Sequence, residues 1–439
     1  MKKLLVLAYD FPPYISVGGL RPYSWFKYLK EFDIHPIIVT RQWNNTHGSY
    51  LDYVSAGDSE ETLLEDSQLG EIIRTPYNPN YANRLLLKYG DKKFSLLRKT
   101  FSAYYEFVQY IKPVGPKVGL YKGAREYLKN NKVDAIIATG DPFVLFSYAE
   151  KLSKEFGIPW IADYRDPWSQ NFSAKKSYFS KKIEYYFEKK SVETADSITT
   201  VDLLFKLKLL QLFPTKQINI ISNGYDPFEM EKIKNSVQDN NLLTFSFIGT
   251  IYKWHPLDLL LESFSNYAKK FPGHLFLIKF YGVNNQKSIS NKINNQFPLL
   301  MGKVSFLPKL DNGELLKKVS QDNVLLLFNY YNFTGTKIYD YLGMRRLILL
   351  CFEQDTNALK LKNEYYFKKI ETTIFPQIDI INETNSGIIV KDTAHLMEVL
   401  KELYEEFQTT GQIACKSSGV EKYSRKIQVE KLAKLIKGI

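Results

Sequence analysis

The chain has 439 residues, of which 44% are hydrophobic and 15% aromatic. Single hydrophobic cores stop growing near about 250–300 residues, so this length predicts two or three domains, and the composition excludes a largely disordered chain. Lysine and arginine outnumber aspartate and glutamate by 59 to 47, a formal net charge of +12. The two cysteines, Cys351 and Cys415, are too few for a disulfide framework, so a reducing compartment is expected.

The amino-terminal stretch MKKLLVLAYDF carries a basic pair and an apolar run that meets Asp10 early. We interpret it as a first strand rather than a signal peptide, because no small-residue cleavage site follows. No stretch approaches the roughly 18 apolar residues needed to cross a bilayer. These features predict a cytoplasmic protein, with any membrane contact peripheral, on the inner face of the cell membrane.

The first half of the chain alternates short apolar, β-rich runs with segments of helical period, a pattern typical of parallel α/β domains. The expected strands are Leu4–Tyr9, Ile34–Thr40, Glu71–Pro76, Val133–Thr139, Pro159–Tyr164, Ser197–Val201 and Ile218–Ser222. The expected helices between them include Arg21–Phe32, Phe143–Phe156 and Ser180–Glu193.

A polar stretch at 235–241 is followed by a second series of alternating elements. Its expected strands are Leu243–Ile248, Leu275–Tyr281, Val304–Leu307, Val324–Phe328, Leu347–Phe352 and Gly387–Val390, with helices such as Pro256–Phe271 and Asn312–Gln321 between them. The pattern predicts an α/β protein with two Rossmann-like domains facing a central cleft, because ligands of such sheets bind beyond the carboxyl ends of the strands. We expect domains at 1–235 and 236–420, and a C-terminal helix at 421–439 that packs back on the first domain.

Residues 84–132 interrupt the alternation and hold twelve lysines and arginines against three acidic residues. Apolar and aromatic residues are interleaved with these charges, as in helices that lie on an anionic membrane surface. The alternative is a solvated helical insertion whose apolar side belongs to the core. No base-reading module accompanies the charge, so a nucleic-acid partner is not expected.

Two segments of the first half are candidates for ligand contact. Gly18 and Gly19 follow the first strand and precede a helix, where backbone N–H groups and the helix dipole favour a phosphate, although such a pair can also be only a turn. Asp163, Arg165 and Asp166 follow a later strand between two tryptophans and would suit sugar hydroxyls. The alternative is an Asp–Arg pair that closes a turn.

The second half repeats this arrangement. Gly249, Thr250 and Lys253 lie between a strand and a helix, and Lys253 would reach a diphosphate or remain an exposed loop lysine. Further on, the Thr-Gly-Thr turn that contains Gly335 and Thr336 is expected to cap a helix bearing Lys337 and Asp340. A lysine at a helix N-terminus suits phosphate, and a carboxylate one turn later suits ribose hydroxyls.

The order of these segments resembles GT-B glycosyltransferases, specifically the family 4 type of retaining enzymes that assemble bacterial capsule, O-antigen and other surface polysaccharides. The likeness spans nearly the whole chain. It rests on YDFPP followed by GG, ATGDPF, IADYRDPW, ISNGYD, FIGT, FYG and TGTKIYDYL.

The resemblance implies that the second domain binds a nucleotide-sugar donor and that the first binds the acceptor. It implies that Gly18 and Gly19 approach the donor diphosphate, that Lys253 and Lys337 neutralise it, and that Asp340 contacts ribose. Some positions depart from the family pattern. The earlier acid of the E-x7-E motif is Asn332, Asp340 replaces the usual Glu, Thr250 replaces a diphosphate-binding arginine, and Arg165 stands where many members have a histidine.

These departures make Asp163, Arg165 and Asp166 the candidate catalytic residues of a subgroup. Breaking the sugar–phosphate bond develops negative charge on the diphosphate, which fixed cations and backbone amides stabilise. No two aspartates lie two positions apart, so we expect no bound metal, and no cofactor beyond the nucleotide-sugar substrate. The resulting prediction is a retaining hexosyltransferase that acts on a saccharide or lipid-linked acceptor. The alternatives are an epimerase-like GT-B enzyme and a non-catalytic binding protein of the polysaccharide machinery.

Overall fold

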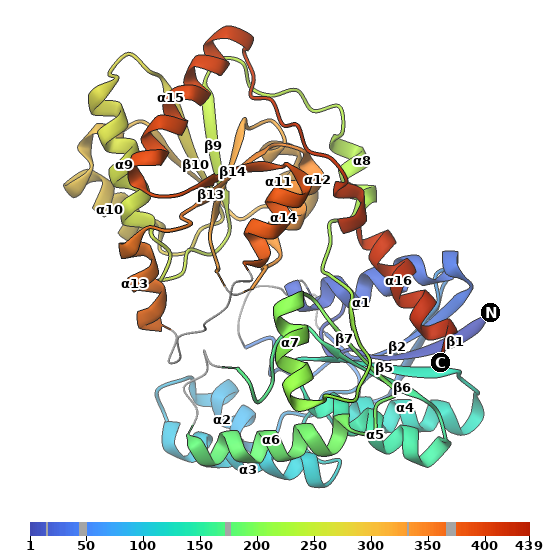
Figure 1. Cartoon of the computed structure of the whole chain (residues 1–439). Helices are drawn as coiled ribbons and strands as arrows, with labels where there is room; N and C mark the ends of the chain where they lie inside the picture. The colour runs from blue at the N-terminus through green and yellow to red at the C-terminus, as the bar shows by residue number, and fades with distance from the viewer. Residues whose placement is uncertain (15, 44–50, 172–176, 332, 366–374) are drawn as a thin grey trace. The chain divides into compact units, whose positions relative to one another are not determined.

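The computed structural model divides the chain into two compact units. Unit 1 comprises Met1–Ser222 and Lys426–Ile439, and unit 2 comprises Asn223–Arg425 (Figure 1). The structure describes all residues except 15, 44–50, 172–176, 332 and 366–374, and only the backbone of 361–365. Each unit is built around one sheet, which confirms the predicted α/β fold with two Rossmann-like domains.

Unit 1 contains an eight-stranded sheet in the order β3-β4-β2-β1-β5-β6-β7-β8. The strands are β1 Lys2–Leu7, β2 Ile34–Arg41, β3 Leu63–Asp66, β4 Glu71–Thr75, β5 Ala135–Gly140, β6 Trp160–Tyr164, β7 Ser197–Thr200 and β8 Ile218–Ile220. All pairs are parallel except β3 with β4. The seven predicted strands are confirmed with small shifts at their ends. The edge strand β3 was not predicted, because all four of its residues are exposed and show no alternation.

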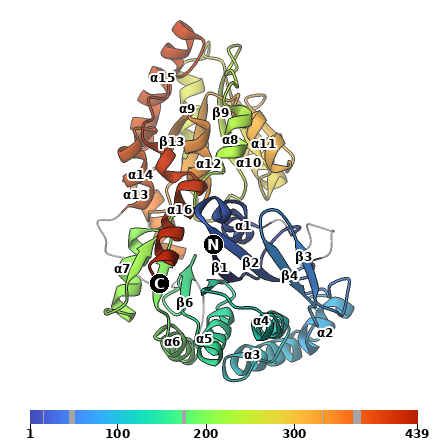
Figure 2. The same cartoon turned by 90° about the vertical axis from the view of Figure 1, so that its right-hand side faces the viewer.

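Both faces of this sheet are covered by helices. In β1, Leu5 and Leu7 pack into one apolar cluster while Leu4 and Val6 pack into another on the opposite face. Helices α4 (Val118–Asn130) and α5 (Val144–Phe156) cover the first face, and α1 (Val17–Tyr28) and α16 (Arg425–Lys437) cover the second (Figures 1 and 2). The C-terminal helix therefore completes the core of unit 1.

The remaining helices of unit 1 are α2 Tyr81–Tyr89, α3 Ser95–Ile111, α6 Tyr178–Val192, α7 Leu203–Leu212 and the 3-10 turn η1 Leu29–Phe32. The insertion predicted over 84–132 is shorter than expected. Leu120, Ala124 and Leu128 of α4 lie in the core beside the sheet, so α4 is part of the Rossmann-like domain and only α2 and α3 depart from the alternation.

Unit 2 contains a six-stranded parallel sheet in the order β11-β10-β9-β12-β13-β14. The strands are β9 Leu243–Ile248, β10 Phe276–Tyr281, β11 Val304–Leu307, β12 Val324–Phe328, β13 Leu347–Cys351 and β14 Gly387–Val390, so the six predicted strands are confirmed to within one residue. The helices are α8 Pro227–Ile233, α9 Leu257–Lys270, α10 Gln286–Gln296, α11 Asn312–Val319, α12 Lys337–Met344, α13 Thr356–Tyr365, α14 Pro376–Thr384 and α15 Thr393–Thr410, with 3-10 turns η2 Pro298–Leu300 and η3 Val420–Tyr423.

The two units separate at Ser222, earlier than the boundary expected at residue 235. The reason is α8, whose Met230 and Ile233 pack into the same apolar cluster as Leu316 and Leu342 of unit 2. The polar stretch at 235–241 therefore lies inside unit 2 and is not the linker.

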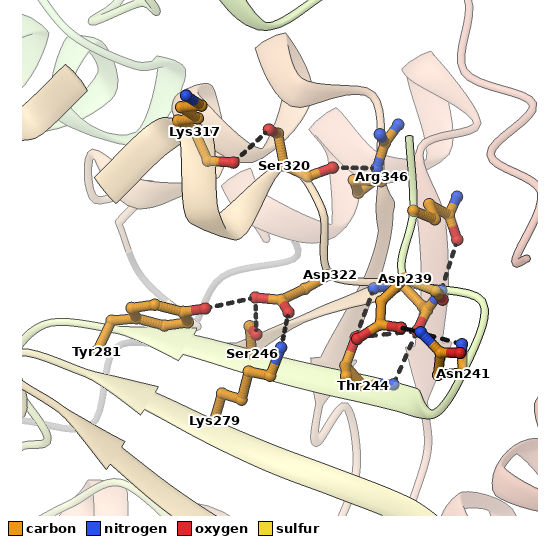
Figure 3. A network of polar contacts seen from close by, with 12 residues as sticks. Asp239, Asn241, Thr244, Ser246, Lys279, Tyr281, Lys317, Ser320, Asp322 and Arg346 are labelled. Atoms are coloured by element: carbon orange, nitrogen blue, oxygen red, sulfur yellow. Dashed lines mark hydrogen bonds and ion pairs between the residues drawn. The ribbon is translucent and has the colours of Figure 1, made fainter. Parts of the chain in front are cut away.

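A buried aspartate organises one face of the second sheet (Figure 3). Asp322 precedes β12 and is fully buried. Its carboxylate accepts hydrogen bonds from the Ser246 hydroxyl at 2.5 Å and the Tyr281 hydroxyl at 2.9 Å, and it pairs with Lys279 Nζ at 2.7 Å. The adjacent Asn323 bonds to both the amide and the hydroxyl of Thr244. These contacts join β9, β10 and the start of β12 through side chains as well as through the backbone.

Replacing Asp322 with alanine is expected to lower the free energy of unfolding of unit 2 by about 3 kcal/mol. The change leaves a half-buried lysine and two hydroxyls without their acceptor, which costs more than the pair contributes. The measurement is amide hydrogen exchange in β9, β10 and β12. As a control, Asp311→Ala removes an exposed carboxylate that makes no capping bond, and should leave exchange in these strands unchanged.

Candidate functional site

The loop that leaves β1 ends at the first turn of α1, where two of the predicted residues lie. The Ser16 hydroxyl accepts a hydrogen bond from the Gly19 amide at 3.1 Å and so caps the helix. A Cβ on Gly18 would overlap both the Asp10 carboxylate and the Arg165 guanidinium, whereas a Cβ on Gly19 would make only ordinary contacts. The structure therefore brings Gly18 and Arg165, which are far apart in the sequence, into contact.

Asp163 has a structural role in place of the catalytic role predicted for it. It is fully buried, and Arg21 Nη2 donates to its Oδ1 at 2.6 Å. The hydroxyls of Thr139 and Thr199 donate to its two oxygens at 2.8 Å and 2.6 Å. Because these neighbours occupy the carboxylate and cover it completely, no surface is left to touch a substrate.

Arg165 and Asp166 lie at the carboxyl end of β6 with accessible surface. Arg165 Nε donates to the Gly140 carbonyl at 2.8 Å, and Nη2 donates to the Asp141 carbonyl at 2.6 Å. Nη1 has no hydrogen-bond partner among the described residues. The alternative Asp–Arg pair is not formed, since the described contacts join Arg165 to backbone carbonyls. One donor of the guanidinium is thus left for a ligand.

Asp10 was not among the predicted site residues. Its Oδ2 accepts a hydrogen bond from the Ser16 hydroxyl at 2.7 Å, and its Oδ1 is buried without a partner among the described residues. Burial raises the pKa of the Asp10 carboxyl, while the Ser16 hydrogen bond and the charge of Arg165 oppose the rise. The sequence contained a pattern that could have identified Asp10. It is the first charged residue after the apolar run of β1, just as Asp163 follows the apolar run of β6.

In unit 2, the turn after β9 and the start of α12 come together around one lysine. Gly249 adopts a left-handed backbone with φ of 75°, and a Cβ there would stand 3.4 Å from Lys337 Cε. Lys337 Nζ donates to the Thr250 carbonyl at 3.2 Å and lies 4.3 Å from the centre of the Phe247 ring. Burial lowers the pKa of Lys337 to about 8. The predicted residues Gly249, Thr250 and Lys337 therefore form one cluster at the carboxyl edge of the sheet.

The other predictions for this edge have different outcomes. Lys253 is exposed, and no described contact joins it to Lys337. Thr336 occupies the N-cap position of α12, but its side chain makes no capping hydrogen bond because its backbone is already close to helical, with φ of −110° and ψ of −28°. Gly335 is required for another reason: its φ is 70°, and a Cβ would overlap the Tyr330 ring.

Asp340 lies one turn after Lys337 on α12 and is partly exposed. Residues three apart on a helix share a side, but the charges that act on Asp340 are those of Arg425 and Asp226 and not that of Lys337. Burial raises the pKa of Asp340 to about 6, and the nearby Arg425 opposes this rise. Asn332, which takes the place of the first acid of the family motif, lies outside the described residues. Within the described part of the chain, no group of three or more His, Cys, Asp and Glu side chains is arranged to hold a metal ion.

No protein-family model matches the chain, and no curated protein matches it in sequence. Solved structures do match it along its whole length. Sucrose-phosphate synthase from Thermosynechococcus elongatus superposes with a TM-score of 0.63 at 13% identity, covering 100% of this chain and 99% of that one. An α,α-trehalose-phosphate synthase from Burkholderia xenovorans, in complex with glucose-6-phosphate, gives 0.64 at 9% identity with 100% of both chains covered.

A third structure, the trehalose-6-phosphate protein from E. coli bound with UDP-2-fluoro glucose, gives a TM-score of 0.61 at 12% identity and covers 100% of this chain and 99% of that one. The chain has a GT-B fold. At these identities the likeness is one of fold. The cluster around Arg165 in unit 1 and the cluster around Lys337 in unit 2 each lie at the carboxyl edge of a parallel sheet. Rossmann-like sheets bind their ligands at this edge.

We expect the two glycines of α1 to respond differently to alanine. Gly18→Ala should lower the melting temperature, equivalent to about 1–3 kcal/mol, because the new methyl group displaces Asp10 or Arg165. Gly19→Ala should be neutral or slightly stabilising, because its Cβ meets only ordinary contacts and alanine is the better helix former. Thermal unfolding of both variants tests this order, and equal melting temperatures would contradict the described packing.

Proposed function

We propose that the chain is a retaining glycosyltransferase that moves a sugar from a nucleotide-diphosphate donor to a saccharide or lipid-linked saccharide. The observation that carries this proposal is the cluster of Gly249, Thr250 and Lys337 in unit 2, which presents a lysine at the carboxyl edge of a parallel sheet. The full-length likeness to a sucrose-phosphate synthase and to trehalose-phosphate synthases supports it. The sequence motifs favour a family 4 type of enzyme in bacterial surface polysaccharide assembly.

The donor would be held mainly by unit 2. Lys337 offers an ammonium group to the diphosphate, and the positive end of α12 adds to the attraction. Asp340, one turn later, would accept hydrogen bonds from the ribose hydroxyls. Lys253 is a second cation for the diphosphate, and being exposed it would contribute less than the partly desolvated Lys337.

The acceptor would be held mainly by unit 1. Arg165 Nη1 and the exposed carboxylate of Asp166 can donate and accept hydrogen bonds with sugar hydroxyls or phosphate. Gly18 and Gly19 lie at the first turn of α1, where the positive end of the helix dipole would attract the donor diphosphate, and the cation beside Gly18 is Arg165. We propose a cytoplasmic location, next to the membrane where a lipid-linked acceptor would be found.

The reaction requires charge to be stabilised on the leaving diphosphate. As the bond between the anomeric carbon and the phosphate oxygen breaks, its electron pair remains on the diphosphate, where Lys337 lowers the barrier electrostatically. The acceptor oxygen forms the new bond from the same face, and its proton passes to the leaving phosphate oxygen. This chain supplies positioning and charge, so the step needs no enzymatic nucleophile.

The test is incubation with a panel of nucleotide sugars, with and without saccharide and lipid-linked saccharide acceptors. Nucleotide release that requires an acceptor, with a new glycosidic bond of retained configuration, is the expected result. Sugar interconversion without an acceptor would replace the proposal with an epimerase-like function. Donor binding in a thermal shift without turnover on any acceptor would instead indicate a binding protein.

Donor affinity should fall as pH rises from 7 to 9. Burial holds the pKa of free Lys337 at about 8, so the charged form that attracts the diphosphate is complete below this value and is lost above it. Lys337→Arg keeps its charge and should remove this pH dependence. Lys337→Ala should weaken binding about 10- to 100-fold at pH 7, and Lys253→Ala less. Calorimetric titration with the donor nucleotide measures the affinity of the wild type and of the three variants. If the affinities of the wild type and Lys337→Arg change with pH in the same way, Lys337 is not the group that binds the diphosphate.

A further inference from the structure

Helix α3 exposes an apolar stripe that is interrupted by Thr100. Its members Leu96, Tyr104, Phe107 and Ile111 are spaced by eight, three and four positions and so lie on one side of the helix. Leu96 is 78% exposed and Tyr104 is 58% exposed. The core of unit 1 receives other side chains of this helix, such as Tyr110. Helix α3 therefore has two apolar sides, one that packs on unit 1 and one, the stripe, that is exposed.

Helix α6 repeats this feature with aromatic side chains and positive charges. Tyr178 is 74% exposed, Phe179 is 72% exposed and Tyr186 is 59% exposed. Lysines share this side of the helix at positions 182, 189 and 190. Glu188 is buried and accepts hydrogen bonds from Tyr164 and the Ser169 amide. The exposed Glu193 pairs with Lys189 at 3.6 Å, whereas no described ion pair offsets Lys182 or Lys190.

The two helices are neighbours and touch through the buried side chain of Phe187 on α6. The Phe107 ring lies 5.9 Å from the Phe187 ring, and the Tyr110 ring lies 5.2 Å from it. Figures 1 and 2 show α3 and α6 on the side of the unit 1 sheet that α4 and α5 cover. We name the exposed sides of α3 and α6 the α3–α6 face.

We propose that the α3–α6 face docks on the surface of an anionic lipid bilayer. Aromatic rings favour the headgroup region of a bilayer, and lysines beside them can keep their ammonium groups at anionic headgroups while their stems lie along the apolar surface. No helix within the described residues is long and apolar enough to span a membrane, so the contact is one that lies on the surface. The proposal does not rest on the glycosyltransferase activity, although it would bring the enzyme close to a lipid-linked acceptor.

The charge of the face favours a membrane over a second copy of the chain. Pairing this face with itself would oppose the lysines of α6 to one another, whereas an anionic bilayer complements them. The sequence had indicated the stretch 84–132 for membrane contact. We now propose α3 and α6 for this contact. Helix α4 packs in the core and is left out, and α6, which lies outside that stretch, supplies exposed aromatic and basic side chains.

The test is flotation of the full chain with vesicles of phosphatidylcholine alone and of phosphatidylcholine mixed with phosphatidylglycerol. Binding should be stronger to the anionic vesicles and should weaken with salt. Lys182→Gln, Lys189→Gln and Lys190→Gln together should lower the affinity for anionic vesicles about 100-fold, since each cation near the surface contributes about fivefold. Leu96→Ser, Phe179→Ser and Tyr186→Ser together should lower it about tenfold or more.

Matched controls come from unit 2. Lys269→Gln, Lys270→Gln and Lys317→Gln change the net charge equally at exposed positions, and Leu275→Ser and Leu299→Ser remove exposed apolar side chains. These variants should bind anionic vesicles like the wild type. Equal loss in the controls, no loss in the face variants, or absence of binding to anionic vesicles would overturn the proposal. Sedimentation that shows a dimer dissociated by the face variants, without vesicle binding, would assign the face to a second copy.

Discussion

The carboxyl edge of the first sheet depends on the ion pair between Arg21 of α1 and Asp163 of β6. Both side chains are buried, and such a pair is tolerated only when nearly every donor and acceptor is satisfied. Here the pair also reaches Thr139 of β5 and Thr199 of β7, while Arg21 Nη1 donates to the Ile221 carbonyl at 2.6 Å after β8. One interaction thus fixes α1 against four strands, and with it the turn that carries the glycines beside Arg165.

The second sheet contains a comparable buried aspartate, Asp322. A comparison of Asp163 and Asp322 with the other charged residues shows which polar side chains are available for function. Asp163 and Asp322 are both fully buried, with hydroxyl and cationic partners around their carboxylates. Arg165 and Lys337 differ, because each is held by backbone carbonyls and keeps donor capacity for another group. In both units, saturated charges hold the sheet together, and partly satisfied cations lie at the edge where ligands of this fold bind.

The fold was predictable from the sequence because apolar runs and helical periods are local signals, and all thirteen expected strands formed. The edge strand β3 lacked such a signal. The site was predictable only in part, since a charged residue after an apolar run looks the same whether its side chain turns into the sheet, as for Asp163, or out of it, as for Asp166. Which of these occurs depends on partners such as Arg21, distant in sequence. The contact of Lys337 with Thr250 is likewise a product of tertiary packing.

The α3–α6 face shows why helical period alone does not reveal what a helix contacts. An apolar stripe with the same spacing can face a core, a membrane or another protein, and the sequence of α3 contains apolar residues on more than one side. Exposed aromatic surface of this kind promotes association between copies unless something opposes it. On α6 the lysines have this effect, since they repel a second copy. The same charges would complement the anionic surface proposed for this face, so resistance to self-association and attraction to a bilayer would follow from one arrangement of side chains.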